Sequence, residues 1–147
     1  VLDMTYVLNS SKAGKDAQEF LKKTFNDNAK KFSDLEKALK EEETDLLAKK
    51  NILSKEEYTK KSDELRKKVI DYQSQRRSSI DKLAAQRSKA RKDLLEQVEP
   101  IIDAYINENG ISLVIDKKNM IGGSKEYDIT KTIVEKLNKK FPSLNLQ

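Results

Sequence analysis

The sequence predicts a mostly α-helical protein with a small β body, in which a long antiparallel helical hairpin arm is attached to a short-stranded sheet or barrel that other subunits complete. Two observations support this fold class. Only 4 of the 147 residues are Gly and 2 are Pro, which is too few for a turn-rich all-β domain. Charged residues make up 37% of the chain, and its apolar residues recur at helical spacing, which is typical of long exposed helices.

A heptad pattern predicts the first long helix over about residues 14–50. Its seam positions alternate at intervals of four and three residues, and two of them are polar. They are Leu21, Phe25, Asn28, Phe32, Leu35, Leu39, Glu42 and Leu46. The pattern stops at residues 51–54, a length that suits a tight connection between antiparallel helices.

The second long helix is predicted over residues 55–109. Ser54 and Glu57 have the spacing of a capping box at its start, and Gly110 supplies a C-cap signal at its end. Beyond Ala90 the spacing becomes about four residues, which changes the face that the helix buries. The apolar positions there are Leu94, Val98, Ile102 and Tyr105 or Ile106. Before that point the seam positions are Tyr58, Ser62, Leu65, Val69, Tyr72, Arg76, Ser79, Leu83, Gln86 and Ala90.

The remaining chain predicts one strand and one helix. Residues 111–115 form a short β-branched run typical of a strand. Asp128 is expected to cap a last helix over about residues 129–140, with Ile133, Val134 and Leu137 facing inward.

Helix length decides the predicted domain organisation. The two long helices would measure about 55 Å and about 80 Å, whereas a compact domain of this size has a radius of gyration of about 15 Å. We therefore expect residues 14–109 to form the arm with its tip near residues 51–54, and residues 1–13 and 110–147 to form the body. So little sheet is unstable alone, which predicts an oligomer. The residues expected in the shared body are Ile111, Leu113, Val114 and Ile115.

Several kinds of catalysis are excluded by composition. The chain has no Cys and no His, which rules out Ser-His and Cys-His nucleophiles and leaves only carboxylates for a zinc site. It also has no Gly-rich phosphate loop. Asp116 is the best candidate for a functional acid, although a capping role accounts for it better. We expect a protein that is not an enzyme, with no catalytic residue, no metal ion and no cofactor.

The positive charge is concentrated in one stretch. Net charge is +5, but residues 66–92 hold ten basic residues against Asp71 and Asp81, and they include every arginine of the chain. Such a stretch is either a solvated helix face or a surface for acidic protein, lipid head groups or nucleic acid. The two seam phenylalanines either hold the hairpin together or contact a bound protein. The candidate binding residues are Arg66, Arg76, Arg77, Arg87, Arg91, Phe25 and Phe32.

The order of these parts resembles the Skp/OmpH family of periplasmic chaperones, over nearly the whole chain. Each motif is short, and their order and spacing carry the resemblance. The motifs are Val1-Leu2-Asp3-Met4, Val7-Leu8-Asn9-Ser10, Ala13-Gly14-Lys15, Gly110-Ile111-Ser112-Leu113-Val114-Ile115-Asp116 and Asp128-Ile129-Thr130.

The resemblance implies a periplasmic homotrimer with a shared β body and three helical arms around a cavity. It implies a holdase for unfolded outer-membrane β-barrel proteins that works without ATP. Anionic lipid or lipopolysaccharide is a further implied partner, and nucleic acid is not expected. One departure is that the family's first strand has several apolar residues ahead of the Val1 equivalent, which this sequence lacks.

Three other readings stay open on the residues alone. A prefoldin-like cytosolic chaperone also carries coiled-coil arms on a β body, but the N-terminal pattern and Asp128-Ile129-Thr130 favour Skp/OmpH. The basic stretch would suit a nucleic-acid-binding coiled-coil hairpin, which predicts steeply salt-dependent binding. A structural spacer would have neither activity.

Overall fold

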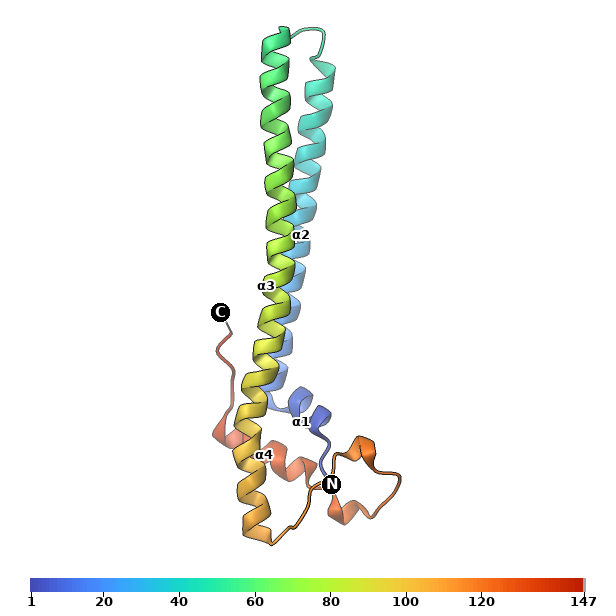
Figure 1. Ribbon diagram of the computed structural model, residues 1–147, viewed down its shortest axis with the longest axis vertical. Helices are drawn as coiled ribbons and strands as arrows, with labels where there is room; N and C mark the ends of the chain where they lie inside the picture. The colour runs from blue at the N-terminus through green and yellow to red at the C-terminus, as the bar shows by residue number, and fades with distance from the viewer. Residues whose placement is uncertain (147) are drawn as a thin grey trace. The chain divides into compact units, whose positions relative to one another are not determined.

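The computed structural model describes residues 1–146, which fold mainly into four α-helices (Figure 1). This confirms the mostly helical class. Two 3₁₀ helices, η1 (Lys117–Asn119) and η2 (Lys125–Tyr127), follow the long helices in the chain. The α-helices are α1 (Met4–Ser10), α2 (Lys12–Ala48), α3 (Lys55–Asn109) and α4 (Thr130–Lys140).

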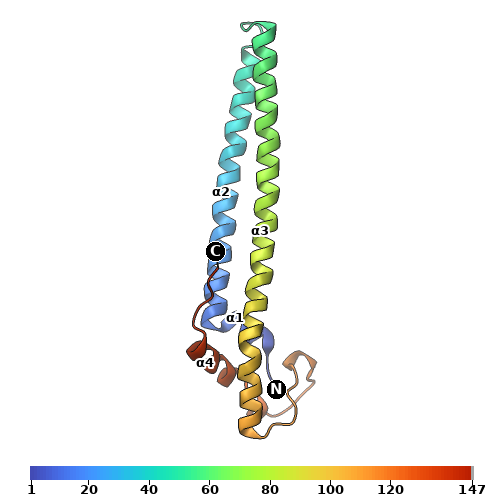
Figure 2. The ribbon, with the colours of Figure 1, turned by 60° about the vertical axis from the view of Figure 1, so that its left-hand side comes forward.

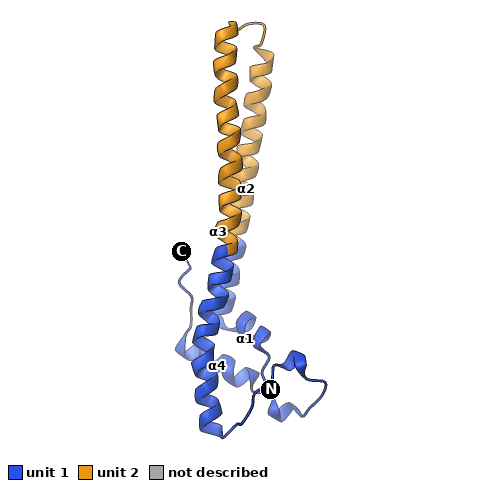
Figure 3. Ribbon diagram, in the orientation of Figure 1, with its two compact units in different colours: residues 1–22, 85–147 blue, residues 23–84 orange. Residues whose placement is uncertain are grey.

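The chain clusters into two compact units (Figure 3). Unit 1 comprises Val1–Lys22 and Ala85–Gln147, and unit 2 comprises Lys23–Ala84. Both long helices contribute to both units. The sequence predicts a body of residues 1–13 and 110–147 and an arm of residues 14–109. This division concerns an assembled protein, and it stays a prediction.

Helix α3 begins and ends where the sequence predicts. At its start, Glu57 N–H donates to Ser54 Oγ at 3.2 Å, and Ser54 N–H donates back to Glu57 Oε2 at 3.4 Å. At its end, Gly110 has a φ of 62°, and Ile111 N–H donates to the carbonyl of Ile106 at 3.0 Å. This is the Schellman arrangement, which needs a left-handed residue that glycine adopts without strain.

The N-terminal segment differs from the prediction. Residues 1–13 were expected in a β body, but α1 occupies Met4–Ser10. Asp3 explains the difference, because its Oδ1 accepts the N–H of Tyr6 at 2.9 Å and caps the helix. The next helix starts directly afterwards, and a Cβ at Gly14 would collide with the carbonyl oxygen of Leu8. Only glycine allows this close approach of backbone to backbone.

The strand predicted at residues 111–115 is not formed in the single chain. Its place is taken by one parallel bridge between Leu2 and Asp116, where Leu2 N–H donates to the carbonyl of Ile115 at 3.0 Å and Lys117 N–H donates to that of Leu2 at 2.9 Å. A strand requires continued hydrogen bonding to a neighbouring strand. Here the pairing does not continue past Leu2, because the N–H of Asp3 donates to the Thr130 hydroxyl instead. The strand prediction is wrong for the isolated chain for this reason.

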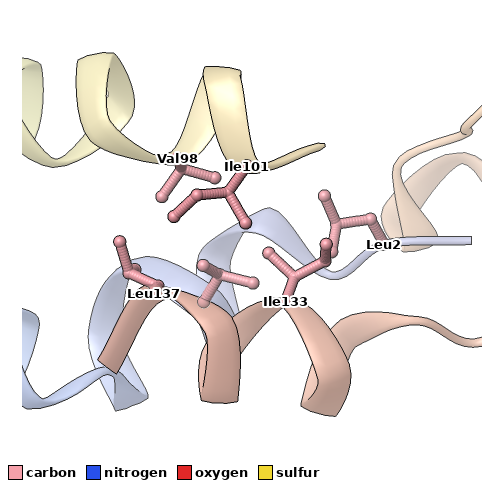
Figure 4. Close-up of a cluster of buried hydrophobic side chains, with 6 residues drawn as sticks. Leu2, Val98, Ile101, Ile133 and Leu137 are labelled. Atoms are coloured by element: carbon pink, nitrogen blue, oxygen red, sulfur yellow. The ribbon is translucent and has the colours of Figure 1, made fainter. Parts of the chain in front are cut away.

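Unit 1 contains a compact apolar core (Figure 4). Val98 and Ile101 of α3 face Ile133 and Leu137 of α4, and Leu2 closes one end. Helix α4 buries the expected Ile133 and Leu137 completely. On α3 the spacing of four after Ala90 is confirmed at Leu94 and Val98, but Ile101 is buried rather than Ile102. The interval from Val98 to Ile101 is three residues, and this keeps the buried side chains on one face of a helix that has 3.6 residues per turn.

Candidate functional site

In unit 2 the segments of α2 and α3 lie side by side in both views (Figures 1 and 2). The predicted seam is confirmed at 12 of its 15 positions in this unit, which are buried or half-buried, whereas Phe25, Leu35 and Arg76 are exposed. Burial is nevertheless thin. Of the apolar residues described in unit 2, Phe32 and Leu65 are buried, at 6% and 9% exposure.

Polar contacts supplement this thin packing. Lys68 Nζ lies 2.7 Å from Oε1 of Glu42, one of the two polar seam residues of α2. Tyr72 donates its hydroxyl to Glu36 Oε2 at 3.4 Å and packs edge-on against Phe32, with ring centroids 6.0 Å apart. These pairs fix the alignment of the two helices, although exposed charges contribute little stability.

One side of the seam is hollowed by two adjoining cavities, of about 490 Å³ and about 310 Å³. Both are lined by Glu36 and Tyr72, so we describe them together as the Tyr72 groove. About half of the lining side chains are aliphatic or aromatic. The larger cavity includes Leu39, Leu46, Leu47, Tyr58, Leu65 and Val69, and the smaller one includes Phe25, Ala29, Phe32, Ile80 and Leu83.

A third cavity, of about 300 Å³, is polar, and we call it the polar cleft. Its charged lining residues are Glu42, Asp45, Lys49, Lys61 and Glu64. Lys61 and Asp45 each precede a seam residue, whereas Glu36 and Ile80 of the Tyr72 groove each follow one. Residues before and after the seam lie on opposite sides of an antiparallel helix pair, so the hairpin has one apolar and one polar side.

The five arginines are all exposed, and the structure does not bring them to one face. Arg66 and Arg76 line the Tyr72 groove, but Arg77 lines neither of its cavities. Arg66 also approaches Asp63 at 3.5 Å. Arg87 and Arg91 belong to unit 1. Their role in binding stays a prediction.

The two candidate phenylalanines have different environments. Phe25 is 58% exposed at the rim of the groove, whereas Phe32 is buried against Tyr72. The sequence reading missed Ile80, which is 61% exposed and lines the same groove. Its position after seam residue Ser79 was not a sufficient signal, because Ile70 likewise follows seam residue Val69 and does not line the groove.

A network of hydrogen bonds joins the chain ends within unit 1. Asp128 Oδ1 accepts the N–H and the hydroxyl of Thr130, and its Oδ2 accepts from Lys117 Nζ at 3.0 Å. These donors hold the pKa of Asp128 at about 2, with the Thr130 hydroxyl contributing most. The hydrogen bond to Asp128 raises the pKa of Lys117. Asp116 caps η1 through the N–H of Lys118, so the capping interpretation of Asp116 is confirmed.

The residues predicted for a shared body differ in exposure. Val114 packs against the unit 1 core, whereas Leu113 and Ile115 are 72% and 46% exposed. Ile111 is half-buried. Exposure along the segment does not follow strict alternation, because the half-buried Ile111 and Val114 are three residues apart, but the apolar side chains of Leu113 and Ile115 are uncovered in the single chain.

Two further observations concern metal sites and membrane-spanning helices. Across residues 1–146, no group of three or more acidic, His or Cys side chains gathers as a metal site would require. None of the helices in that range is long and apolar enough to cross a membrane.

Comparison with known proteins places these features in a wider group. Residues 1–137 match the family model described as outer membrane protein (OmpH-like). A Skp-like protein of Pseudomonas aeruginosa is 25% identical over 142 residues, covering 94% of this chain and 82% of that protein. A crystal structure from Caulobacter crescentus, of a protein described as an OmpH-like outer membrane chaperone, superposes with a TM-score of 0.92. It covers 99% of this chain and 86% of its own at 19% identity, which identifies the fold.

Proposed function

This chain belongs to the OmpH-like family, and on that premise we propose that it is an ATP-independent holdase that keeps unfolded outer-membrane β-barrel proteins soluble in the periplasm. The family match over residues 1–137 carries the proposal. The described likenesses to a Skp-like protein and to a chaperone of the same fold support it.

The active form in this proposal is a homotrimer with a shared β body. Support comes from residues 111–115, which form no strand in the single chain and leave Leu113 and Ile115 exposed. Strand pairing with a second copy would satisfy the free backbone groups and bury both side chains. In this arrangement Ile111 and Val114 complete the same sheet or barrel.

Client capture would depend on many weak contacts rather than on one tight site. Unit 2 is thinly packed and presents exposed apolar side chains beside exposed arginines. Unfolded barrel proteins expose alternating apolar residues, and several simultaneous weak contacts hold such a chain while it stays mobile. Release needs no nucleotide, because a client that folds is withdrawn by mass action.

Anionic lipid or lipopolysaccharide is a second partner class within this proposal. The ten basic residues of the stretch 66–92 would attract phosphorylated head groups. Vesicles with and without anionic lipid would separate this binding from client capture.

Native mass spectrometry, with and without an unfolded outer-membrane protein, tests the proposal. We expect the mass of three chains and a complex with one client, and we expect the protein to suppress client aggregation without ATP. A monomer that leaves aggregation unchanged would contradict both the oligomer and the holdase activity. A trimer without client binding would contradict the activity alone.

A further inference from the structure

The two cavities of the Tyr72 groove adjoin each other on one side of the seam and are open to solvent. They meet at Glu36 and Tyr72 and extend from Phe25 to Leu47 along α2. These limits are 22 residues apart, which corresponds to about 33 Å along a helix. The polar cleft on the other side of the seam has charged lining residues and the Lys68–Glu42 ion pair nearby. An apolar partner would therefore be bound on one side of the hairpin only.

We propose that the Tyr72 groove binds an extended apolar segment of an unfolded polypeptide, with an acidic side chain of that segment paired to Arg76. This inference rests on the proposed holdase function and names the surface that carries it. An extended chain rises about 3.3 Å per residue, so the groove accommodates about ten residues. A membrane-spanning strand of a β-barrel has about 9–11 residues.

Charge complementarity supports the acidic side chain. Arg76 occupies a seam position, lines the groove and forms no ion pair with any residue in the range 1–146. Arg66 lines the groove ten residues away, which is about 15 Å along the helix and about the span of four or five extended residues. A client segment with carboxylates at that separation would reach both guanidinium groups.

The acidic residues of the groove do not cancel this preference. Glu36 is already paired with Lys40 at 3.3 Å and accepts the Tyr72 hydroxyl. Glu43 is the other carboxylate of the lining, whose cations are Lys40, Arg66 and Arg76. Lys40 is paired with Glu36 and Arg66 approaches Asp63, so Arg76 is the lining cation that remains for an acidic side chain of the client.

The chain offers a closely matched test. Ile80 lines the groove and Ile70 does not, although both are isoleucines of α3 with exposures of 61% and 57%. Arg76 lines the groove and its neighbour Arg77 does not. The groove variant is Arg76→Gln with Ile80→Gln, and the control variant is Arg77→Gln with Ile70→Gln. Both variants alter exposed side chains and have the same composition.

Affinity for an unfolded outer-membrane β-barrel protein, diluted from urea and followed by fluorescence, is the readout. We expect the groove variant to weaken binding about tenfold and the control variant less than about twofold. Equal weakening by both variants would overturn the groove while leaving the holdase function intact. A wild-type protein that binds no client would instead refute the proposed function itself, and the inference with it. Unchanged circular dichroism melting verifies that both variants fold.

Synthetic ten-residue peptides distinguish the kind of occupant. An apolar peptide with Asp at positions 3 and 7 should bind the wild-type protein more tightly than its Lys counterpart, and Arg76→Gln should remove the difference. A central proline prevents a helix but not an extended chain, so it should leave binding unchanged. Loss of binding with proline would identify a helical occupant and overturn the proposal. Competition by phosphatidylcholine vesicles, which carry no net charge, that disappears in the groove variant would identify an acyl chain and overturn it equally.

Discussion

The two units of the molecule bury apolar surface to very different extents. Within residues 1–146, the buried apolar side chains belong to unit 1 except for Phe32 and Leu65. Unit 1 packs α1, α3 and α4 around a core that includes fully buried Ile133 and Leu137. Unit 2 consists of two helices, each with a single neighbour, so every seam residue keeps one side open to water.

This difference indicates which part of the chain is available to bind other molecules. A helix pair without a third layer cannot cover its own seam, so apolar side chains stay accessible along it. A core enclosed on several sides gives stability but no accessible apolar floor. Unit 1 therefore stabilises the fold, and unit 2 supplies the candidate binding surface.

The largest effect on stability is expected in the unit 1 core. Leu137→Ala should lower the free energy of unfolding by about 3 kcal/mol, because it leaves a cavity in a fully enclosed site. Urea denaturation at fixed protein concentration measures this. Leu47→Ala, at a site that is 58% exposed in unit 2, is the control and should change stability by less than about 0.5 kcal/mol. Equal losses would remove the distinction between the two units.

A smaller and local effect is expected from Phe32→Ala. The ring contacts Tyr72 at the most buried point of unit 2, but water reaches its neighbours, so we expect a loss of about 2 kcal/mol. Hydrogen exchange should show reduced protection of unit 2 amides and unchanged protection of those in unit 1. Phe25→Ala, at an exposed site, is the matched control. Loss of protection in both units would mean that they unfold together.

The Asp128 network of unit 1 predicts a pH dependence. Its pKa is about 2 in the folded protein and higher when unfolded, so the stabilisation is complete above about pH 5 and is lost as pH falls from about 4 to 2. Asp128→Asn should cost about 1 kcal/mol at pH 7, since solvent screens part of the interaction. Thermal unfolding between pH 2 and pH 7 measures this. A variant whose stability curve parallels that of the wild type across the window would refute the role of Asp128.

The smallest effect is expected at the exposed ion pair of unit 2. Glu42→Gln should lower stability by about 0.5 kcal/mol, because Lys68 and Glu42 are both largely solvated. The difference should vanish in 1 M NaCl, where the screening length is about 3 Å. Glu43→Gln, which removes the same charge one residue away without breaking that pair, is the control. A loss above about 2 kcal/mol would show that unit 2 depends on this pair more than its packing suggests.

Much of this fold could be predicted because its signals are local. The capping box at Ser54 and the left-handed Gly110 depend on neighbouring residues, so the bounds of α3 followed directly from the sequence. The seam of unit 2 followed from the heptad spacing for the same reason. Part of the Tyr72 groove could also be predicted, because Phe25 and Arg76 are seam residues.

Other features depended on contacts between distant residues. Helix α1 was missed because it is only seven residues long, and it is stabilised by the Asp3 cap and by burial of Val7 and Leu8 in the core. The strand at residues 111–115 was expected from a β-branched run, but a strand also needs a partner, which this chain alone does not provide beyond the single bridge at Leu2.

The sequence by itself determined the helical class, the hairpin connection and the periodic seam, because each is encoded within a few turns of chain. The tertiary structure alone decided which side of the seam is apolar and which is polar. That choice depends on how two helices align, and the alignment fixes whether Ile80 and Arg76 share one cavity with Phe25. Packing between distant segments decided it, and no local pattern contains that information.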